Sequence, residues 1–252
     1  MKSRLEAATS EVVAVAQAFD VAAQQHTIHT LPRQALGHGV TTADMEKVYS
    51  QRMARRGAPG REIYDELFES SPHGRCPLCA QRSVATLDHY LPKAHYPALA
   101  VTPLNLVPCC TDCNKAKLDA IPRSPESVSL NPYYDQIDDH RWLSAEVVQT
   151  RPSAVLFSIS APAQWDATLT ARVENHFRMF GLARLYASQA AEELLNIRQQ
   201  LLDLQARGGT AAVRAQLQER AASAERARSN GWRAATYRAW SISAWFCRGG
   251  FA

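Results

Sequence analysis

Cys76-Pro77-Leu78-Cys79 and its later counterpart Cys110-Thr111-Asp112-Cys113 decide the fold of this chain. Each is a CxxC pair, and two such pairs supply the four soft thiolates of a closed, tetrahedral zinc site. The 30 residues between the pairs exceed the roughly 15–20 of a simple zinc ribbon, so we expect a further structured segment between them. The sequence therefore predicts a structural zinc ion bound by four ligands: Cys76, Cys79, Cys110 and Cys113.

Two neighbouring residues are alternatives within this ligand set. Cys109 directly precedes Cys110, and His73 lies three residues before Cys76. The two-residue spacing of a CxxC pair favours Cys110 over Cys109, and two complete pairs leave no vacancy for His73. Six cysteines in 252 residues are too sparse for a disulfide scaffold, so we expect metal binding in a reducing compartment.

Between and just after the pairs, polar residues follow a specific order: Asp88-His89, then Asn105, then Asn114. Here the chain resembles the HNH endonucleases, the zinc-stapled ββα-metal nucleases. Asp88-His89 matches the family's first-strand pair, Asn105 its central asparagine and Asn114 its last position. The nine-residue offset from Asn105 to Asn114, with two cysteines between them, also follows the family pattern. The resemblance covers about residues 76–117, roughly a sixth of the chain.

The resemblance implies a role for each of these residues. A histidine is mostly neutral at cytosolic pH, so His89 would act as the general base that takes a proton from water. Asn105 would hydrogen-bond across the loop and orient His89. Asp88 and Asn114 would bind a catalytic Mg²⁺ or Mn²⁺, because carboxylate and amide oxygens suit hard cations.

The chain departs from the family pattern in two places. The last position is Asn114 where the family has histidine, which makes this an HNN variant. The glycine-rich stretch common after the first histidine is replaced by residues 93–97, which read Lys-Ala-His-Tyr-Pro. We predict nucleic-acid contacts for four side chains near the motif, with ordinary solvated side chains as the alternative: Lys93, His95, Lys115 and Lys117.

Apolar periodicity predicts that the flanks of this motif are mainly helical. Helices are expected over about 4–25, from Thr42, over 63–68 and from Asp166 onward, with a break at residues 208–210. The motif itself should form strands at 83–90 and 104–107 and a helix at 112–118, and a β-hairpin is expected around 142–160. The predicted fold is therefore mainly α with a small ββα-metal core, in three regions: 1–72, 73–120 and 121–252.

Composition narrows the class of protein. With 46% hydrophobic and 21% charged residues, the chain is neither disordered nor collagen-like. Glu6, Glu11 and Asp20 interrupt every apolar run of a secretory signal, and prolines interrupt the longest uncharged stretch, at 94–111. We expect a cytoplasmic protein with no membrane partner. The net charge of +4 permits a nucleic-acid partner without requiring one.

These observations predict a metal-dependent endonuclease that hydrolyses phosphodiester bonds of DNA. The resemblance extends to prokaryotic nucleases of anti-phage systems, which implies an ATPase or other sensor subunit as a partner. The apolar stripe from Leu194 to Leu204 fits either a partner-binding hairpin or packing within the chain. Two other functions stay open: a non-catalytic zinc-stapled module that binds nucleic acid or protein, and a restriction or mobile-element nuclease. The sequence does not indicate an oligomeric state.

Overall fold

The computed structural model describes residues 2–33 and 35–252; Met1 and Gln34, both in the predicted region 1–72, lie outside the described residues. Contacts divide the chain into two compact units. The first unit comprises the described residues up to Asp135 together with Ala171–Phe180, and the second comprises Gln136–Thr170 and Gly181–Ala252. The predicted regions 1–72 and 73–120 thus fall in the first unit, and the region 121–252 is divided between both.

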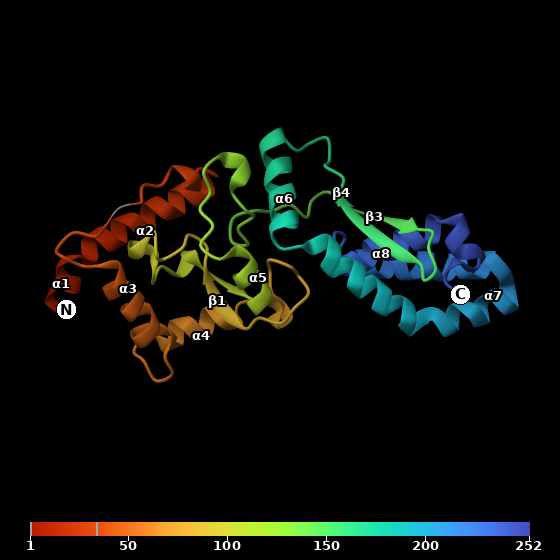
Figure 1. Cartoon of the computed structure of the whole chain (residues 1–252), viewed down its shortest axis with the longest axis horizontal. Coiled ribbons are helices and arrows are strands. Elements are labelled where there is room, and N and C mark those ends of the chain that lie inside the picture. The colour runs from red at the N-terminus through yellow and green to blue at the C-terminus, as the bar shows by residue number, and fades with distance from the viewer. Residues whose placement is uncertain (1, 34) are drawn as a thin grey trace. The chain divides into compact units, whose positions relative to one another are not determined.

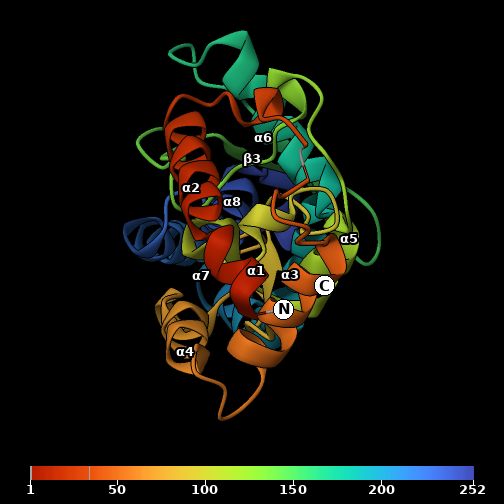
Figure 2. The same ribbon diagram turned by 90° about the vertical axis from the view of Figure 1, so that its left-hand side faces the viewer.

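Short helices make up the N-terminal part of the first unit and face the viewer in Figure 2. They are α1 (Lys2–Ala7), α2 (Thr9–Gln24), α3 (Thr42–Val48), a π-helical turn (Tyr49–Ala54) and α4 (Arg61–Glu69). Thr41 caps α3: its hydroxyl accepts from the Asp44 N–H, and the Asp44 carboxylate accepts from the Thr41 N–H. The helix predicted over 4–25 is divided at Ala8, and the helices predicted from Thr42 and at 63–68 are confirmed.

The predicted motif strands and helix are present in the centre of the first unit. β1 (Thr86–His89) pairs antiparallel with β2 (Leu106–Cys109), with His89 opposite Leu106, and α5 (Thr111–Lys117) follows directly. Leu87 and Leu106 pack with Met53 in a cluster that residues of the π-helical turn and α4 extend. A second cluster joins Ala8, Leu36, Val40 and Met45 to Ala98 and Ala100 in the connection between the strands. The N-terminal helices therefore support both β1 and that connection.

The first unit is completed by a segment that returns from later in the chain. α6 (Ala167–Met179) enters it at Ala171, and its Arg172 binds the Asp135 carboxylate with two nitrogens, at 2.9 and 2.7 Å. Both side chains are 4% exposed. Such a buried, doubly hydrogen-bonded pair fixes the returning segment, Ala171–Phe180, to the chain at Asp135.

The second unit contains a hairpin, green in Figure 1, two helices in cyan to blue, and a C-terminal π-helical turn (Phe246–Gly250). β3 (Leu143–Val148) and β4 (Ala154–Ile159) form the predicted hairpin, and α7 (Leu182–Ala227) and α8 (Trp232–Ile242) pack against it. Gly209 interrupts α7 with φ 61° and ψ −157°, a conformation that essentially only glycine adopts, which confirms the predicted break. Beyond it, Arg220 donates to the Gln200 side chain at 2.6 Å, so the two arms of α7 lie side by side.

The apolar stripe of α7 is used inside the second unit. Leu194, Ile197 and Leu201 are all buried. Of the two readings of this stripe, packing within the chain is therefore the one observed. The fold as a whole is mainly helical with two small antiparallel sheets. Over residues 2–33 and 35–252, none of the helices combines the length and the apolar character needed to cross a bilayer.

Candidate functional site

The four predicted zinc ligands form one buried cluster: Cys76, Cys79, Cys110 and Cys113. Their sulfur atoms all lie within 4.8 Å of one another, and the sulfurs of Cys79 and Cys110 are 4.0 Å apart. A tetrahedral site with Zn–S bonds of about 2.3 Å needs sulfurs about 3.8 Å apart. The donor set thus fits, and the cluster could hold a metal ion such as zinc. Cys109 is buried outside the cluster and His73 is exposed, as the spacing predicts.

Local hydrogen bonds shape the two halves of this cluster. The Cys76 N–H donates to the Arg82 carbonyl at 2.8 Å, and its carbonyl accepts from the Ala80 N–H at 2.7 Å. In the second half, the Cys110 sulfur caps α5 by accepting from the Cys113 N–H at 3.4 Å. The sequence did not reveal a further support: His176, from the returning segment, donates through Nε2 to the Leu78 carbonyl at 2.7 Å.

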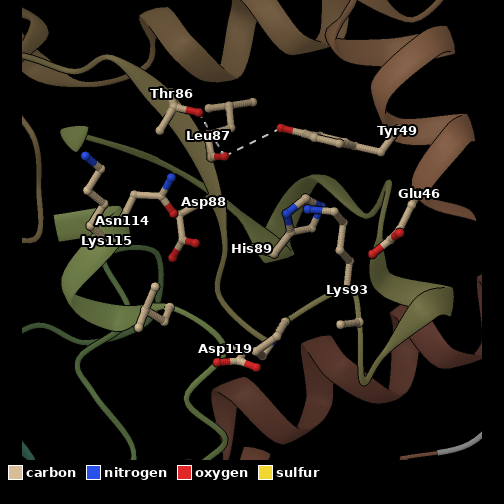
Figure 3. A pocket seen from close by; sticks show the side chains of 13 residues that line it. Glu46, Tyr49, Thr86, Leu87, Asp88, His89, Lys93, Asn114, Lys115 and Asp119 are labelled. Carbon is tan, nitrogen blue, oxygen red and sulfur yellow. Dashed lines mark hydrogen bonds between the residues drawn. The ribbon is translucent and has the colours of Figure 1, made fainter. Parts of the chain in front are cut away.

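Next to the cluster, a cavity of about 390 Å³ brings together side chains from the whole predicted motif. Asp88 and His89 reach it from β1, and Asn114 from α5, as Figure 3 shows. Three of the four residues that the family resemblance singles out therefore meet in one place. The fourth, Asn105, is completely buried and does not line the cavity.

His89 is held in a single orientation. Its Nε2 lies 2.9 Å from the Ala100 carbonyl, which can only accept, so Nε2 carries the ring proton. In the neutral ring, Nδ1 is then the unprotonated nitrogen. Burial lowers the pKa of His89 to about 4, so the ring is neutral at neutral pH. The Tyr49 ring stands edge-on to it, with centroids 4.5 Å apart and planes at 70°.

Asn105 holds the connection between β1 and β2 together by hydrogen bonds to its backbone. Its Oδ1 accepts from the Leu91 N–H at 2.7 Å, and its Nδ2 donates to the carbonyls of Leu91 at 3.0 Å and Leu99 at 3.2 Å. The next carbonyl along the chain is that of Ala100, which accepts from His89. Asn105 therefore acts on His89 through the loop backbone and not by direct contact.

Asp88 lies on the other side of β1 from His89, as alternation along a strand requires. Its carboxylate accepts from the Lys117 ammonium at 2.9 Å, and both side chains are buried. Burial raises the pKa of Asp88, and the positive charge of Lys117 opposes that rise. Asn114 lines the same cavity as Asp88, and both side chains are labelled in Figure 3. Asn114 and Lys117 are three residues apart on α5 and so share the helix face turned toward Asp88.

The four predicted nucleic-acid contacts are placed differently from one another. Lys93 and Lys115 line the cavity, the first half-buried with its ammonium 5.5 Å from the Tyr49 ring centre and the second exposed. His95 does not line the cavity; its Nε2 is 3.8 Å from the Asp119 carboxylate. Lys117 is buried on Asp88, a position that favours an ion pair over contact with a phosphate.

Sequence reasoning missed three residues that line the same cavity: Glu46, Tyr49 and Asp119. Glu46 and Tyr49 precede Asp88 by 42 and 39 residues and stand in an ordinary amphipathic pattern. Nothing local distinguishes them, because only the packing of the π-helical turn on β1 brings Tyr49 to His89. Asp119 lies two residues after the end of α5, and its closeness in sequence to Asn114 could have indicated it.

Comparison with known proteins gives one informative match. The chain is 32% identical over 164 residues to protein ea31 of Escherichia phage lambda. That alignment includes 63% of this chain and 54% of the phage protein, so the chain spans about half the length of this relative. No family model matches the chain, and no solved structure does.

Proposed function

We propose that this protein is a metal-dependent endonuclease of the HNH type that hydrolyses phosphodiester bonds of DNA. The observation that carries the proposal is the state of His89: neutral, with an unprotonated Nδ1, beside a cavity that also receives Asp88 and Asn114. A buried neutral imidazole next to a hard-oxygen donor pair is the combination that general-base hydrolysis of a phosphodiester needs.

His89 is the general base in this proposal. Its Nδ1 takes a proton from the attacking water, while Nε2 keeps its proton, donates it in a hydrogen bond to the Ala100 carbonyl and so holds the ring in place. The same carbonyl then stabilises the positive imidazolium that results. Asn105 is a positioning residue, since it fixes the loop that presents this carbonyl.

Asp88 and Asn114 would hold the catalytic Mg²⁺ or Mn²⁺. One carboxylate and one amide oxygen fit a hard cation that keeps several waters of its own. When bound, the ion supplies Lewis-acid stabilisation to the phosphate and to the departing oxygen. Lys93 and Lys115, at the same cavity, add positive charge for the incoming phosphate.

Zinc at the four cysteines is the structural part of the proposal. β1, β2 and α5 are 4, 4 and 7 residues long, so they bury little apolar surface without help. A structural metal replaces that missing core. The family resemblance also leads us to propose an ATPase or other sensor subunit as partner, which co-expression with the flanking genes would test.

A plasmid-cleavage assay tests the proposal. Purified protein is incubated with supercoiled DNA and Mg²⁺ or Mn²⁺, and His89→Ala is compared with His140→Ala as the control. His140 lies outside the motif and does not line the cavity. Loss of the general base should lower the cleavage rate by about 10²–10⁴-fold, and His140→Ala should change it little.

Each other outcome of this assay has a definite meaning. Equal cutting by wild type and His89→Ala would refute the role of His89. Absence of cutting by zinc-loaded wild type, alone and with its co-expressed neighbours, would favour a non-catalytic binding module. Cutting into discrete fragments would favour a restriction or mobile-element nuclease.

A further inference from the structure

The candidate metal site already contains a positive charge that belongs to the chain. The Lys117 ammonium donates to the Asp88 carboxylate at 2.9 Å and to the His89 carbonyl at 2.7 Å. A lysine this deeply buried is rare unless it is paired. Its partner is the one carboxylate in the proposed donor pair of the divalent ion.

The charges at this site balance without a metal ion. Asp88 contributes −1, Lys117 contributes +1 and the Asn114 amide contributes none. Glu46 and Asp119 also line the cavity, and among the described residues no group of three or more His, Cys, Asp or Glu side chains close enough to share a metal ion includes Asp88. A divalent ion next to Asp88 would therefore meet a carboxylate whose charge is already neutralised. The positive charge of Lys117 would also repel the ion, most strongly in a low-dielectric setting.

Hydrogen bonds hold the Lys117 ammonium at Asp88. Two of its three donors are engaged, and its backbone is fixed at the end of α5, one helical turn after Asn114. A phosphate that enters the cavity brings the negative charge that the site lacks. Metal and phosphate then favour each other's binding, as reciprocal linkage requires.

We propose that Lys117 is a resident cation that neutralises Asp88, so that the site holds Mg²⁺ or Mn²⁺ weakly by itself and firmly only together with a DNA phosphate. This inference rests on the proposed function. It assigns Lys117 as a positioning residue that sets metal affinity, in place of the phosphate contact predicted from sequence.

A Mn²⁺ titration followed by electron paramagnetic resonance of the free ion tests the inference without measuring activity. The parent protein is zinc-loaded His89→Ala, so that added DNA is not cut. Lys117→Met removes the charge with a similar shape, Lys117→Arg keeps it, and Asp88→Asn removes the carboxylate. Without DNA, Lys117→Met should bind Mn²⁺ about tenfold or more tightly than the parent, and Lys117→Arg should match the parent. A short DNA duplex should tighten Mn²⁺ binding by the parent and have a much smaller effect on Lys117→Met.

Failure of the inference and failure of the proposed function look different. If Asp88→Asn abolishes Mn²⁺ binding but Lys117→Met leaves it unchanged or weaker, Lys117 is a structural residue only and the nuclease proposal stands. If Asp88→Asn binds Mn²⁺ like the parent, Asp88 is not a metal ligand and the proposed function fails.

Folding of the variants provides a second readout. Lys117→Met leaves the buried Asp88 carboxylate without its partner, so the melting temperature of the variant should fall. Mn²⁺ should raise the melting temperature of the variant more than that of the parent. Mn²⁺ that fails to restore Lys117→Met would count against the inference. Lys117→Gln, which can still donate to Asp88, serves as a less disruptive neutral variant.

Discussion

At the scale of the residue, one backbone carbonyl determines the chemistry of His89. Because the Ala100 oxygen accepts from Nε2, the basic nitrogen is the other one, and no side chain is needed to select this tautomer. The hydrophobic cluster that includes Ala100 and Met45 ties this carbonyl to the N-terminal helices. Substitutions in that cluster should therefore affect the base although they lie outside the motif.

The depressed pKa of His89 makes a prediction for stability. Burial lowers the pKa to about 4, so from about pH 6.5 down to about pH 4 the unfolded chain binds a proton that the native one does not. Stability therefore falls as the pH drops through this window, and the contribution of His89 to the loss is roughly 2 kcal/mol at about pH 5. Urea unfolding of wild type and His89→Gln measures it: the variant should lose about 2 kcal/mol less between about pH 7 and about pH 5. An equal loss in both proteins would show that His89 titrates normally when folded.

Contacts between residues far apart in the sequence were the hardest part of the site to predict. Asp88, His89, Asn105 and Asn114 stand out because a local spacing marks them. For Lys117 the sequence predicts a nucleic-acid contact or a solvated side chain, since nothing in a lysine-rich stretch indicates that one ammonium turns inward to Asp88, 29 residues away. Because the burial of a lysine side chain depends on how the whole molecule packs, composition alone favours a side chain in solvent.

At the scale of the element, α5 carries residues of both the cysteine cluster and the candidate site. Cys110 and Cys113 belong to the cluster, Asn114 lines the cavity, and Lys117, one turn later, pairs with Asp88. A seven-residue helix is far below the length that is stable alone in water. Its geometry therefore depends on the cysteine cluster at its first turn.

Adjacent cysteines provide a matched test of that dependence. Cys110→Ser removes a member of the cluster, and Cys109→Ser changes a buried neighbour outside it. Zinc content by elemental analysis should be about one ion per chain for wild type and Cys109→Ser, and well below one for Cys110→Ser. Cys110→Ser should also lose helix signal and melt at a lower temperature. Equal zinc in both variants would contradict the assignment of Cys110, and no zinc in folded wild type would contradict the cluster as a zinc site.

Elements with a strong local signal were predictable, and their exact number was less so. The hairpin β3–β4, the break at Gly209 and the order β1, β2, α5 all follow from turn residues and apolar periodicity. The division at Ala8 does not, because apolar residues continue at helical spacing on both sides of it. The use of the α7 stripe inside its own unit is a tertiary property, equally compatible with a partner until the structure is known.

At the scale of the whole molecule, the first unit is discontinuous in sequence. The chain leaves it at Asp135 and returns at Ala171, and Arg172 on the returning segment meets the carboxylate of Asp135. The sequence regions predicted from composition could not reveal this, because the two charges are 37 residues apart and neither belongs to a motif.

Removing Arg172 should therefore destabilise the unit that contains the candidate site. Arg172→Met leaves the buried Asp135 carboxylate without its guanidinium partner, with the Asn131 N–H still donating to it at 2.6 Å, and should cost about 3–5 kcal/mol. The double variant Asp135→Asn/Arg172→Met should recover much of that loss, and Arg178→Met, an exposed change on the same helix, should stay within about 0.5 kcal/mol of wild type. Urea unfolding gives all three values. A small effect of Arg172→Met would mean that the returning segment contributes little to the first unit.

The discontinuity also sets an order of events during protein synthesis. His176 supports the Leu78 carbonyl between two of the cluster's cysteines, yet it leaves the ribosome 98 residues after Leu78. At about 5–20 residues per second, the Leu78 carbonyl waits roughly 5–20 seconds for that support. During this interval, zinc captured by the nascent chain would hold the cysteine pairs in place until the returning segment reaches Leu78.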